Sequence, residues 1–249
     1  MNAKFIEELS LNGWPSLSTV VYDGWLLRFS SGYTKRANSI SPLYDSYLPL
    51  DEKIVECEQR YKVMKQPAIF KLTSFASPPR LDELLAGRGY KIVDRTSVQT
   101  RSLDEVKVPV ITSVSLEKRA SKQWLDTYSR LSGVTSRHRH TMEQMLGKIQ
   151  GRTGYIMLYD DAREIVACGL GVVEREYIGL YDIVTASQHR NRGYGEQMIL
   201  HLLHWGRDNS AKHSYLAVVA DNRPAIRLYA KLGYKEEYTY WYRICAEDR

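Results

Sequence analysis

Hydrophobic and polar positions form two short strand-like runs near the N-terminus, within residues 18–29. The runs read STVVY and WLLRF, and Asp23-Gly24 separates them. Short runs rich in β-branched and aromatic residues are typical of strands, and Asp-Gly between them is a strong signal for a two-residue hairpin turn. We therefore expect a β-hairpin here, and a third strand over residues 35–41 after the turn SGYT.

The apolar period changes to that of a helix after residue 50. Ile54, Cys57, Tyr61 and Met64 lie three or four residues apart, and acidic residues occupy the first turn. Residues 51–66 are therefore expected to be helical. The rest of this half is expected to contain a strand at 68–75, a helix at 78–90 that begins at prolines and ends at glycines, and a strand at 90–100.

The same alternation of strand and helix returns after a break at Val108-Pro109. The polar stretch VTSRHRH, residues 134–140, is expected to be a loop, with Arg137–His140 inside it. The expected elements are a strand at 110–117, helices at 122–133 and 141–149, antiparallel strands within 154–185, a helix within 187–206, a strand at 213–220, a helix at 222–233 and a strand at 234–244. Because Tyr and Trp alternate with polar residues in this last strand, it is expected to be buried.

A comparison of the chain with itself indicates an internal repeat. When it is shifted by 144 residues, residues 72–91 align without a gap with seven identities. Chance similarity between two strand–helix–Gly–Tyr units is the alternative. The identities are Leu72 with Leu216, Ala76 with Ala220, Leu84 with Leu228, Ala86 with Ala230, and Gly89-Tyr90-Lys91 with Gly233-Tyr234-Lys235. We predict an α/β fold of two tandem units, residues 1–108 and 109–249, each a mixed, mostly antiparallel sheet flanked by helices.

Composition and charge narrow the classes of function. The chain has 249 residues, 43% of them hydrophobic, which is enough for a substantial core. It has no apolar leader and no apolar run of about 18 residues, so we expect neither a signal peptide nor a membrane interaction. Three cysteines without metal-binding spacing predict a cytoplasmic location and no metal. The net charge is +6, but bases and acids are interleaved except around Arg190, so we expect a local anion site and no nucleic-acid partner.

This basic cluster has the composition of a phosphate-binding loop. Residues 190–195 read RNRGYG, and an apolar helical run follows at once. A helix N-terminus has about four unpaired N–H groups and about half a positive charge, and glycine lets an anion approach the backbone. Arginines add charge-assisted hydrogen bonds. The loop lacks the Gly-Lys-Ser/Thr of a Walker motif and the third glycine of a dinucleotide fingerprint, and by itself RxxGxG also fits a tight strand–helix turn.

The surrounding segments make the pattern more specific. The strand LYDIVT leads into the loop, and VVADNRPAIRLYAKLGYK follows about 25 residues after it. Over residues 110–249 this order resembles the GNAT superfamily of acyl-CoA-dependent N-acyltransferases. The resemblance implies that the RxxGxG loop holds the pyrophosphate of coenzyme A, that the backbone of the preceding strand contacts the coenzyme, and that the later segment lines the pantetheine arm. The positions so implied are Ile183, Val184, Thr185, Arg190, Asn191, Arg192, Gly193, Tyr194, Gly195, Glu196, Asn222, Ala225 and Tyr229, with acetyl-CoA the expected donor.

The resemblance also implies a reaction, attack of a neutral amine on a thioester. Tyr229 is the candidate general acid for the leaving thiolate, because a phenol with a pKa of about 10 stays protonated at neutral pH. A helix aromatic packed in the core is the alternative interpretation. Asp182 is a candidate base, beside a water chain and the exposed Glu174 and Glu176. Tyr181 and Asp182 should face opposite sides of a regular strand, so at most one of them would point into the acyl site.

The first half resembles a degenerate copy. Pro78 and Leu85 stand at the positions of Asn222 and Tyr229, and residues 46–53, SYLPLDEK, have acids in place of RxxGxG. One coenzyme site per chain is therefore expected. We predict an N-acetyltransferase that acts on a small-molecule or peptide amine as a monomer or homodimer. A non-catalytic acyl-CoA sensor or scaffold is the alternative. The resemblance places the Arg137–His140 region over the acceptor site, although a solvated polar loop is also consistent with it.

Overall fold

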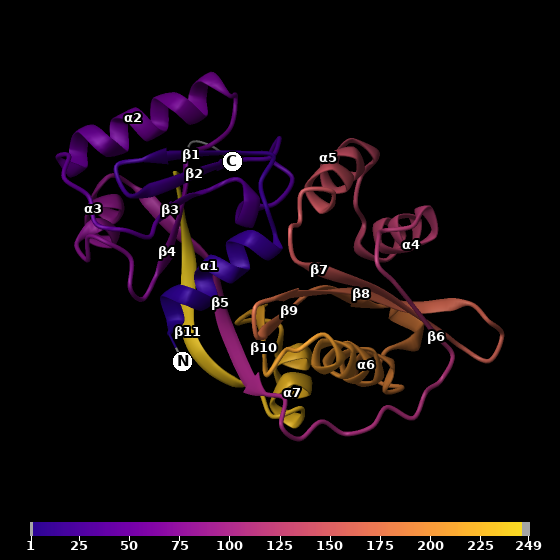
Figure 1. Cartoon of the computed structure of the whole chain (residues 1–249). Helices are drawn as coiled ribbons and strands as arrows, with labels where there is room; N and C mark the ends of the chain where they lie inside the picture. The colour runs from indigo at the N-terminus through magenta and orange to yellow at the C-terminus, as the bar shows by residue number, and fades with distance from the viewer. Residues whose placement is uncertain (1, 246–249) are drawn as a thin grey trace.

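The computed structural model describes residues 2–245 and has one mixed sheet of eleven strands with helices on both faces (Figure 1). This confirms the predicted α/β class. The first half contains α1 Ala3–Gly13, β1 Ser18–Tyr22, β2 Trp25–Phe29, a 3₁₀ turn at Lys35–Ala37, β3 Ile40–Pro42, α2 Leu50–Val63, β4 Ile69–Thr73, α3 Leu81–Gly87 and β5 Tyr90–Ser102. The second half contains β6 Val114–Glu117, α4 Lys122–Ser132, α5 Ser136–Leu146, β7 Arg152–Tyr159, β8 Ile165–Glu174, β9 Tyr177–Thr185, a 3₁₀ turn at Ser187–His189, α6 Tyr194–Asp208, β10 His213–Val219, α7 Arg223–Lys231 and β11 Lys235–Cys245.

The two halves exchange their last strands. The strand order is β1-β2-β3-β4-β11-β5-β10-β9-β8-β7-β6, so β5 lies beside β10 and β11 lies beside β4. Both exchanged pairings are antiparallel, with Ala217 opposite Val98 and Trp241 opposite Leu72. One continuous sheet therefore spans both predicted units. The division of the chain into two domains at 108/109 stays a prediction. Residues 103–113 contain neither helix nor strand.

The elements follow the register of the sequence repeat. A shift of 144 residues maps the first residue of α2 onto that of α6, and the first residue of β4 onto that of β10. The first residues of α3 and β5 map to within two residues of those of α7 and β11. Strand, helix and turn positions therefore correspond in the two halves even where the residues differ.

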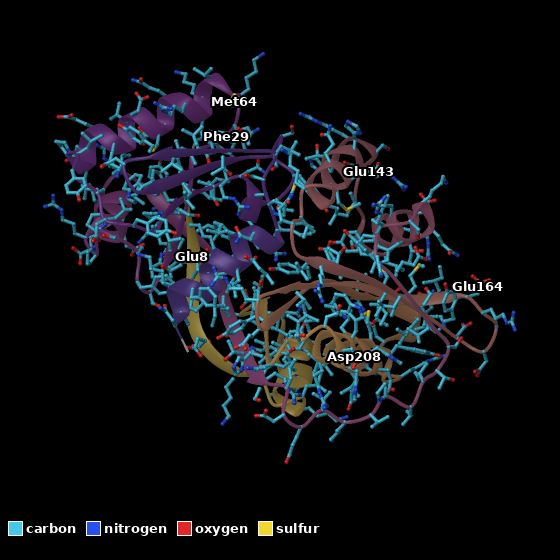
Figure 2. All side chains as sticks on the ribbon, viewed as in Figure 1. Glu8, Phe29, Met64, Glu143, Glu164 and Asp208 are labelled. Atoms are coloured by element: carbon cyan, nitrogen blue, oxygen red, sulfur yellow. The ribbon has the colours of Figure 1, made fainter. Side chains whose placement is uncertain are left out.

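Three hydrophobic clusters cover the two faces of the sheet. On one face a shared cluster combines residues of α1, α4 and α5 with residues of both halves of the sheet. On the other face, α6 and α7 cover one end and α2 and α3 cover the other. In Figure 2, Glu143 on α5 and Asp208 at the end of α6 mark the opposite sides of the sheet. β11 confirms its predicted alternation, since Tyr238, Tyr240 and Tyr242 join the shared cluster while Trp241 packs on the α2 side.

Two local expectations differ from the structure, and the structure has one helix, α1, for which no expectation was made. The polar first residues form α1, which Asn2 caps by accepting a hydrogen bond from the Phe5 N–H, and Ile6 and Leu9 are buried on its inner face. The segment at 35–41 is a 3₁₀ turn followed by the short β3. Arg137–His140 are helical and not a loop, because Thr135 caps α5 by accepting from the His138 N–H, so this helix begins five residues before Thr141.

Leu85, which aligns with Tyr229 in the repeat, is fully buried in the cluster under α2 and α3. We expect Leu85→Ala to lower the free energy of unfolding by about 2–5 kcal/mol, because it leaves a cavity in a packed core. Denaturant titration would measure this. Val63→Ala is the matched control, since Val63 lies on α2 and is exposed, and its change should stay under about 1 kcal/mol. A similar small loss for Leu85→Ala would contradict the assignment of Leu85 to the core.

Candidate active site

The strands β9 and β10 separate near the middle of the sheet. They pair in parallel from Tyr177 and His213 to Leu180 and Leu216, and no further pairing between them follows in the described residues. β10 stays paired with β5 as far as Val219, which lies opposite Thr96. We call this divergence of β9 residues 181–185 from β10 residues 217–219 the fork. Backbone groups of β9 that would face β10 are therefore left for a ligand or solvent, which is unusual for a central strand.

A β-bulge at the start of the fork turns Asp182 toward the shared cluster. Leu170 lies opposite Tyr181 and Cys168 lies opposite Val184, so two residues of β9 face Gly169 alone. Asp182 has a φ of 54°, which lies outside the strand region. Tyr181 packs in the shared cluster, and Asp182 reaches Tyr128 of α4 on the same face. The expectation that these two side chains face opposite sides was wrong, because the bulge interrupts the alternation.

Asp182 has the surroundings of a carboxyl that can accept a proton. Its Oδ1 accepts a hydrogen bond of 2.9 Å from the Tyr128 hydroxyl, while its Oδ2 is buried without a hydrogen-bond partner among the described residues. Burial raises the pKa of Asp182 to about 6, although the charge of Arg36 and the Tyr128 hydrogen bond lower it in part. Near pH 7 the carboxylate form therefore predominates and retains one oxygen free for a new donor.

The N-terminus of α6 is open toward the other end of the fork. Gly193 is its N-cap at a φ of 85°, and no side chain caps the helix. The N–H groups of Tyr194, Gly195 and Glu196 find no acceptor among the described residues, as the first turn of an uncapped helix requires. A Cβ on Gly193 would touch nothing within 4 Å, so the positive φ and not lack of space favours glycine.

Basic side chains without partners surround this helix start. Arg190 and Arg192 are exposed and pair with no carboxylate of the described residues, whereas Glu196 pairs with Lys231 of α7. Asn191 has a left-handed φ of 60°. The positive charges of Arg190 and Arg192 and the positive end of the α6 dipole therefore add up at the start of α6, where they would attract an anion.

The second segment of the sequence pattern lies against the first. A Cβ on Gly195 would lie 3.4 Å from Leu228 Cδ2 and 3.6 Å from Thr185 Oγ1, so α6, α7 and the end of β9 converge there. Asn222 caps α7, its Oδ1 accepting from the Ala225 N–H at 3.3 Å. Ile183 and Ala225 pack at the edge of the same cluster under α6 and α7, and Val184 packs on the opposite face.

Tyr229 lies on α7 in the cluster opposite Asp182. It is 8% exposed, and its ring meets that of Tyr234 edge-on with centroids 5.9 Å apart. Its hydroxyl donates to no other described residue, and burial raises its pKa to about 12. The two candidate proton-transfer groups therefore lie on opposite faces of the sheet, one on each side of the fork.

Sequence reasoning missed the partners of Asp182. Tyr128 comes from α4, Arg36 from the first half, and Tyr33 contacts His138 of α5 with ring centroids 5.6 Å apart. The pattern around Tyr33 and Arg36 suggested only a turn and a strand, so no local signal identified them. Within Arg137–His140, His138 has a ring contact only with Tyr33 among the described residues, and Arg139 forms an ion pair with Asp126 of α4.

Residues 2–245 contain neither a metal-binding group of side chains nor a membrane-spanning helix. No group of three or more His, Cys, Asp or Glu side chains there is arranged to hold a metal ion. No helix in that part of the chain has the length and apolar character needed to span a bilayer.

Comparison with known proteins gives one consistent family. Residues 2–243 match the family described as probable histone acetyltransferase Rv0428c C-terminal. An uncharacterized N-acetyltransferase, YobR of Bacillus subtilis (strain 168), is 30% identical over 247 residues, which cover 96% of this chain and 97% of that protein.

Solved structures agree on the fold. A GCN5-related N-acetyltransferase from Kribbella flavida superimposes with a TM-score of 0.72 at 16% identity, covering 98% of this chain and 95% of its own. A tandem GNAT protein from the clavulanic acid biosynthesis pathway superimposes with a TM-score of 0.60 at 16% identity. The superposition covers 76% of this chain and 66% of that protein. The fork and the open start of α6 agree with these matches. The matches show that the chain belongs to the GNAT family of N-acetyltransferases, which are acyltransferases.

Proposed function

We propose that this chain transfers an acetyl group from acetyl-CoA to a primary amine by direct attack. The observation that carries this is the fork in β9 and β10 beside the uncapped N-terminus of α6. Acetyl-CoA would supply the acyl group as an activated thioester. The free N–H groups of α6 suit a pyrophosphate, and the unpaired edge of β9 suits the amide groups of a pantetheine arm.

Each part of the coenzyme has candidate residues in this chain. Arg190, Arg192 and the N–H groups of residues 193–196 would bind the pyrophosphate through charge-assisted hydrogen bonds. The backbone of residues 183–185 would pair with the pantetheine arm, with Asn222 and Ala225 on its other side, as the family resemblance implies. Backbone N–H groups of β9 at the fork can also donate to the acyl carbonyl oxygen, where negative charge develops during attack.

The proton balance involves one base and one acid. Asp182, with its pKa raised to about 6, would accept the proton that the amine loses, directly or through water. Tyr229 would donate its proton to the leaving sulfur, and burial keeps its phenol protonated before that step. Their placement on opposite sides of the fork suits this division, because the amine forms its C–N bond from one side of the carbonyl carbon and the thiolate departs from it in another direction.

We further propose that the first half is a degenerate copy and binds no coenzyme. The start of α2, which corresponds to that of α6, is preceded by Pro49 and has Asp51 and Glu52 in its first turn. These carboxylates would repel a pyrophosphate. One coenzyme per chain is the expected stoichiometry.

The experiment is calorimetric titration of acetyl-CoA into loop variants. Gly193→Asp and Arg190→Glu should each weaken binding more than tenfold, because negative charge and bulk oppose the pyrophosphate at the helix start. Gly89→Asp is the control for backbone strain, since Gly89 has the same φ of 85° and open surroundings. Arg207→Glu, at the exposed far end of α6, is the control for charge.

Unchanged affinity in folded Gly193→Asp and Arg190→Glu would contradict the coenzyme site. Release of free thiol from acetyl-CoA with a panel of amines then tests catalysis. Binding without turnover on any amine would leave the non-catalytic sensor as the function.

A further inference from the structure

Asp182 faces a polar and aromatic cluster to which the first half of the chain contributes. The cluster consists of Trp14, Tyr33 and Arg36 from the first half and Tyr128 and Asp182 from the second. It lies on the face of the sheet opposite Tyr229 and at the start of the fork, where the acyl group is expected. An amine that reaches the acyl carbon past Asp182 must therefore pass these residues.

Arg36 is held in place through its backbone. The buried Arg28 donates from Nη1 to the Arg36 carbonyl at 2.6 Å, and from Nη2 to the carbonyls of Leu11 and Trp14. The Trp14 indole N–H donates to Thr34 Oγ1 at 3.2 Å, next to the same turn. The end of α1 and the 3₁₀ turn thus form one rigid unit that presents the Arg36 side chain.

No ion pair holds the Arg36 guanidinium within the described residues. It lies 5.5 Å from the centroid of the Trp14 ring, but it forms no hydrogen bond or ion pair with any other residue of the described chain. Its charge is nevertheless close enough to lower the pKa of Asp182. Burial opposes the charge of the half-buried Arg36, but nearby tyrosines and Asp182 outweigh it and raise its pKa, so the guanidinium stays charged. Its N–H groups still need hydrogen-bond acceptors in such a place.

Among the described residues, the Asp182 carboxylate in turn lacks a hydrogen-bond donor for one of its oxygens. Its Oδ2 is buried and accepts no hydrogen bond from the described residues. Arg36 lies over the Trp14 ring, and that ring stacks on Tyr181, the neighbour of Asp182, with centroids 6.0 Å apart. Arg36 and Asp182 form no ion pair with each other within the described chain, so each can bind an opposite charge. A single molecule with an amine and a carboxylate would satisfy both, and the rings of Trp14, Tyr33 and Tyr128 would border its apolar part.

We propose that the acceptor is a small zwitterion of the amino-acid class, with its amine at Asp182 and its carboxylate held by Arg36. This rests on the proposed function, because it names the substrate class of the same site. Polyamines and aminoglycosides fit less well, since Arg36 repels additional cations. A lysine side chain in a histone tail carries no carboxylate beside its amine and would leave Arg36 without a partner.

The test compares each of the common amino acids with the amine obtained by removing its carboxylate. Binding is measured by calorimetry with and without coenzyme A, and acetyl transfer is measured by thiol release. We expect at least one amino acid to bind more than tenfold tighter than its own amine and to show a correspondingly higher kcat/KM. Equal binding of every amino acid and its amine would overturn the proposal, as would preference for a histone-tail peptide.

Variants at Arg36 assign the preference to this side chain. Arg36→Met should bring the ratio of the two kcat/KM values close to one through a higher KM for the amino acid, and Arg36→Lys should keep part of the ratio. Lys35→Met is the matched control in the same turn, because Lys35 pairs with the exposed Asp94. An equal loss for both substrates in folded Arg36→Met would indicate a merely structural role and overturn the proposal.

Different results would contradict the proposed acetyltransferase function and the proposed amino-acid acceptor. Coenzyme titration alone tests the proposed function and does not involve Arg36. A protein that binds coenzyme A and acetylates only amines without a carboxylate would keep the acetyltransferase and reject the amino-acid acceptor.

Discussion

Tyr229→Phe should lower kcat by about a hundredfold and leave the affinity for acetyl-CoA nearly unchanged. The substitution removes one hydroxyl, which donates to no other described residue, so no internal hydrogen bond is lost. The ring keeps its place beside Tyr234 in the cluster under α6 and α7. A positioned general acid contributes about 10²–10⁴-fold, and the loss of the proton donor for the thiolate should therefore appear in turnover.

Steady-state kinetics and calorimetry on the same preparation separate the two effects. Tyr47→Phe is the matched control, because Tyr47 is 94% exposed and lies outside the site. A fully active Tyr229→Phe enzyme would show that water or another group protonates the thiolate. A large loss of coenzyme affinity would instead assign Tyr229 to binding.

Asp182→Asn should change catalysis and stability in opposite directions. If Asp182 is the base, kcat/KM should fall by about a hundredfold at pH 7–8. For the unmodified protein, kcat/KM should decline as the pH is lowered through about 6, where Asp182 becomes protonated, and this inflection should be missing in Asp182→Asn. An unchanged rate and pH profile would favour the water chain as the base.

The sign of the stability effect follows from the raised pKa. The pKa of Asp182 is about 6 in the folded protein against 3.8 for the ordinary carboxyl, so the folded state holds its proton more tightly. Ionised Asp182 therefore lowers stability as the pH rises from about 4 to 6, and this effect is absent below about pH 4. Such a difference corresponds to at most about 3 kcal/mol, so Asp182→Asn should be more stable by up to that amount at pH 7–8 and unaltered near pH 4.

Asp82 provides a control of opposite sign. Hydrogen bonds from Arg243 lower the pKa of Asp82, so its ionised form stabilises the fold above its ordinary pKa. Asp82→Asn should therefore destabilise the protein at neutral pH, and this loss should shrink as the pH falls through the pKa of Asp82. Thermal unfolding of both variants across this pH range measures the effects. Destabilisation by Asp182→Asn at pH 7 would contradict the burial of its charge.

Local chemistry in the sequence was sufficient for the elements that bind the coenzyme in our proposal. Gly193 and Gly195 at the start of an apolar helical run predicted a strand–loop–helix unit, and the structure has β9, the loop and α6 in that order. The repeat also came from local patterns, since Gly89 and Gly233 both end a helix at a positive φ before an exchanged strand. Turn chemistry and helical period act over a few residues, and for that reason they can be read without a structure.

The ends of the helices were harder to predict from the sequence, because a capping residue can start a helix before its hydrophobic period begins. Arg137–His140 have a polar pattern, yet Thr135 caps them into α5. At residues 3–13 the apolar side chains of Ile6 and Leu9 are enough for α1 to dock on the shared cluster. Tertiary packing stabilises short polar helices that a single sequence does not reveal.

By itself, the sequence determined the composition of the anion loop, the order of strands and helices after α1, the similarity of residues 72–91 to residues 216–235, and the candidates Tyr229 and Asp182. Only the tertiary structure decided that the last strands are exchanged, that a bulge turns Asp182 to the same face as Tyr181, and that Arg36 lies in the same cluster. The physical reason is distance along the chain. Strand pairing and side-chain contacts join residues more than a hundred positions apart, such as Leu72 and Trp241, and no local period encodes which distant segment a free carboxylate or guanidinium will meet.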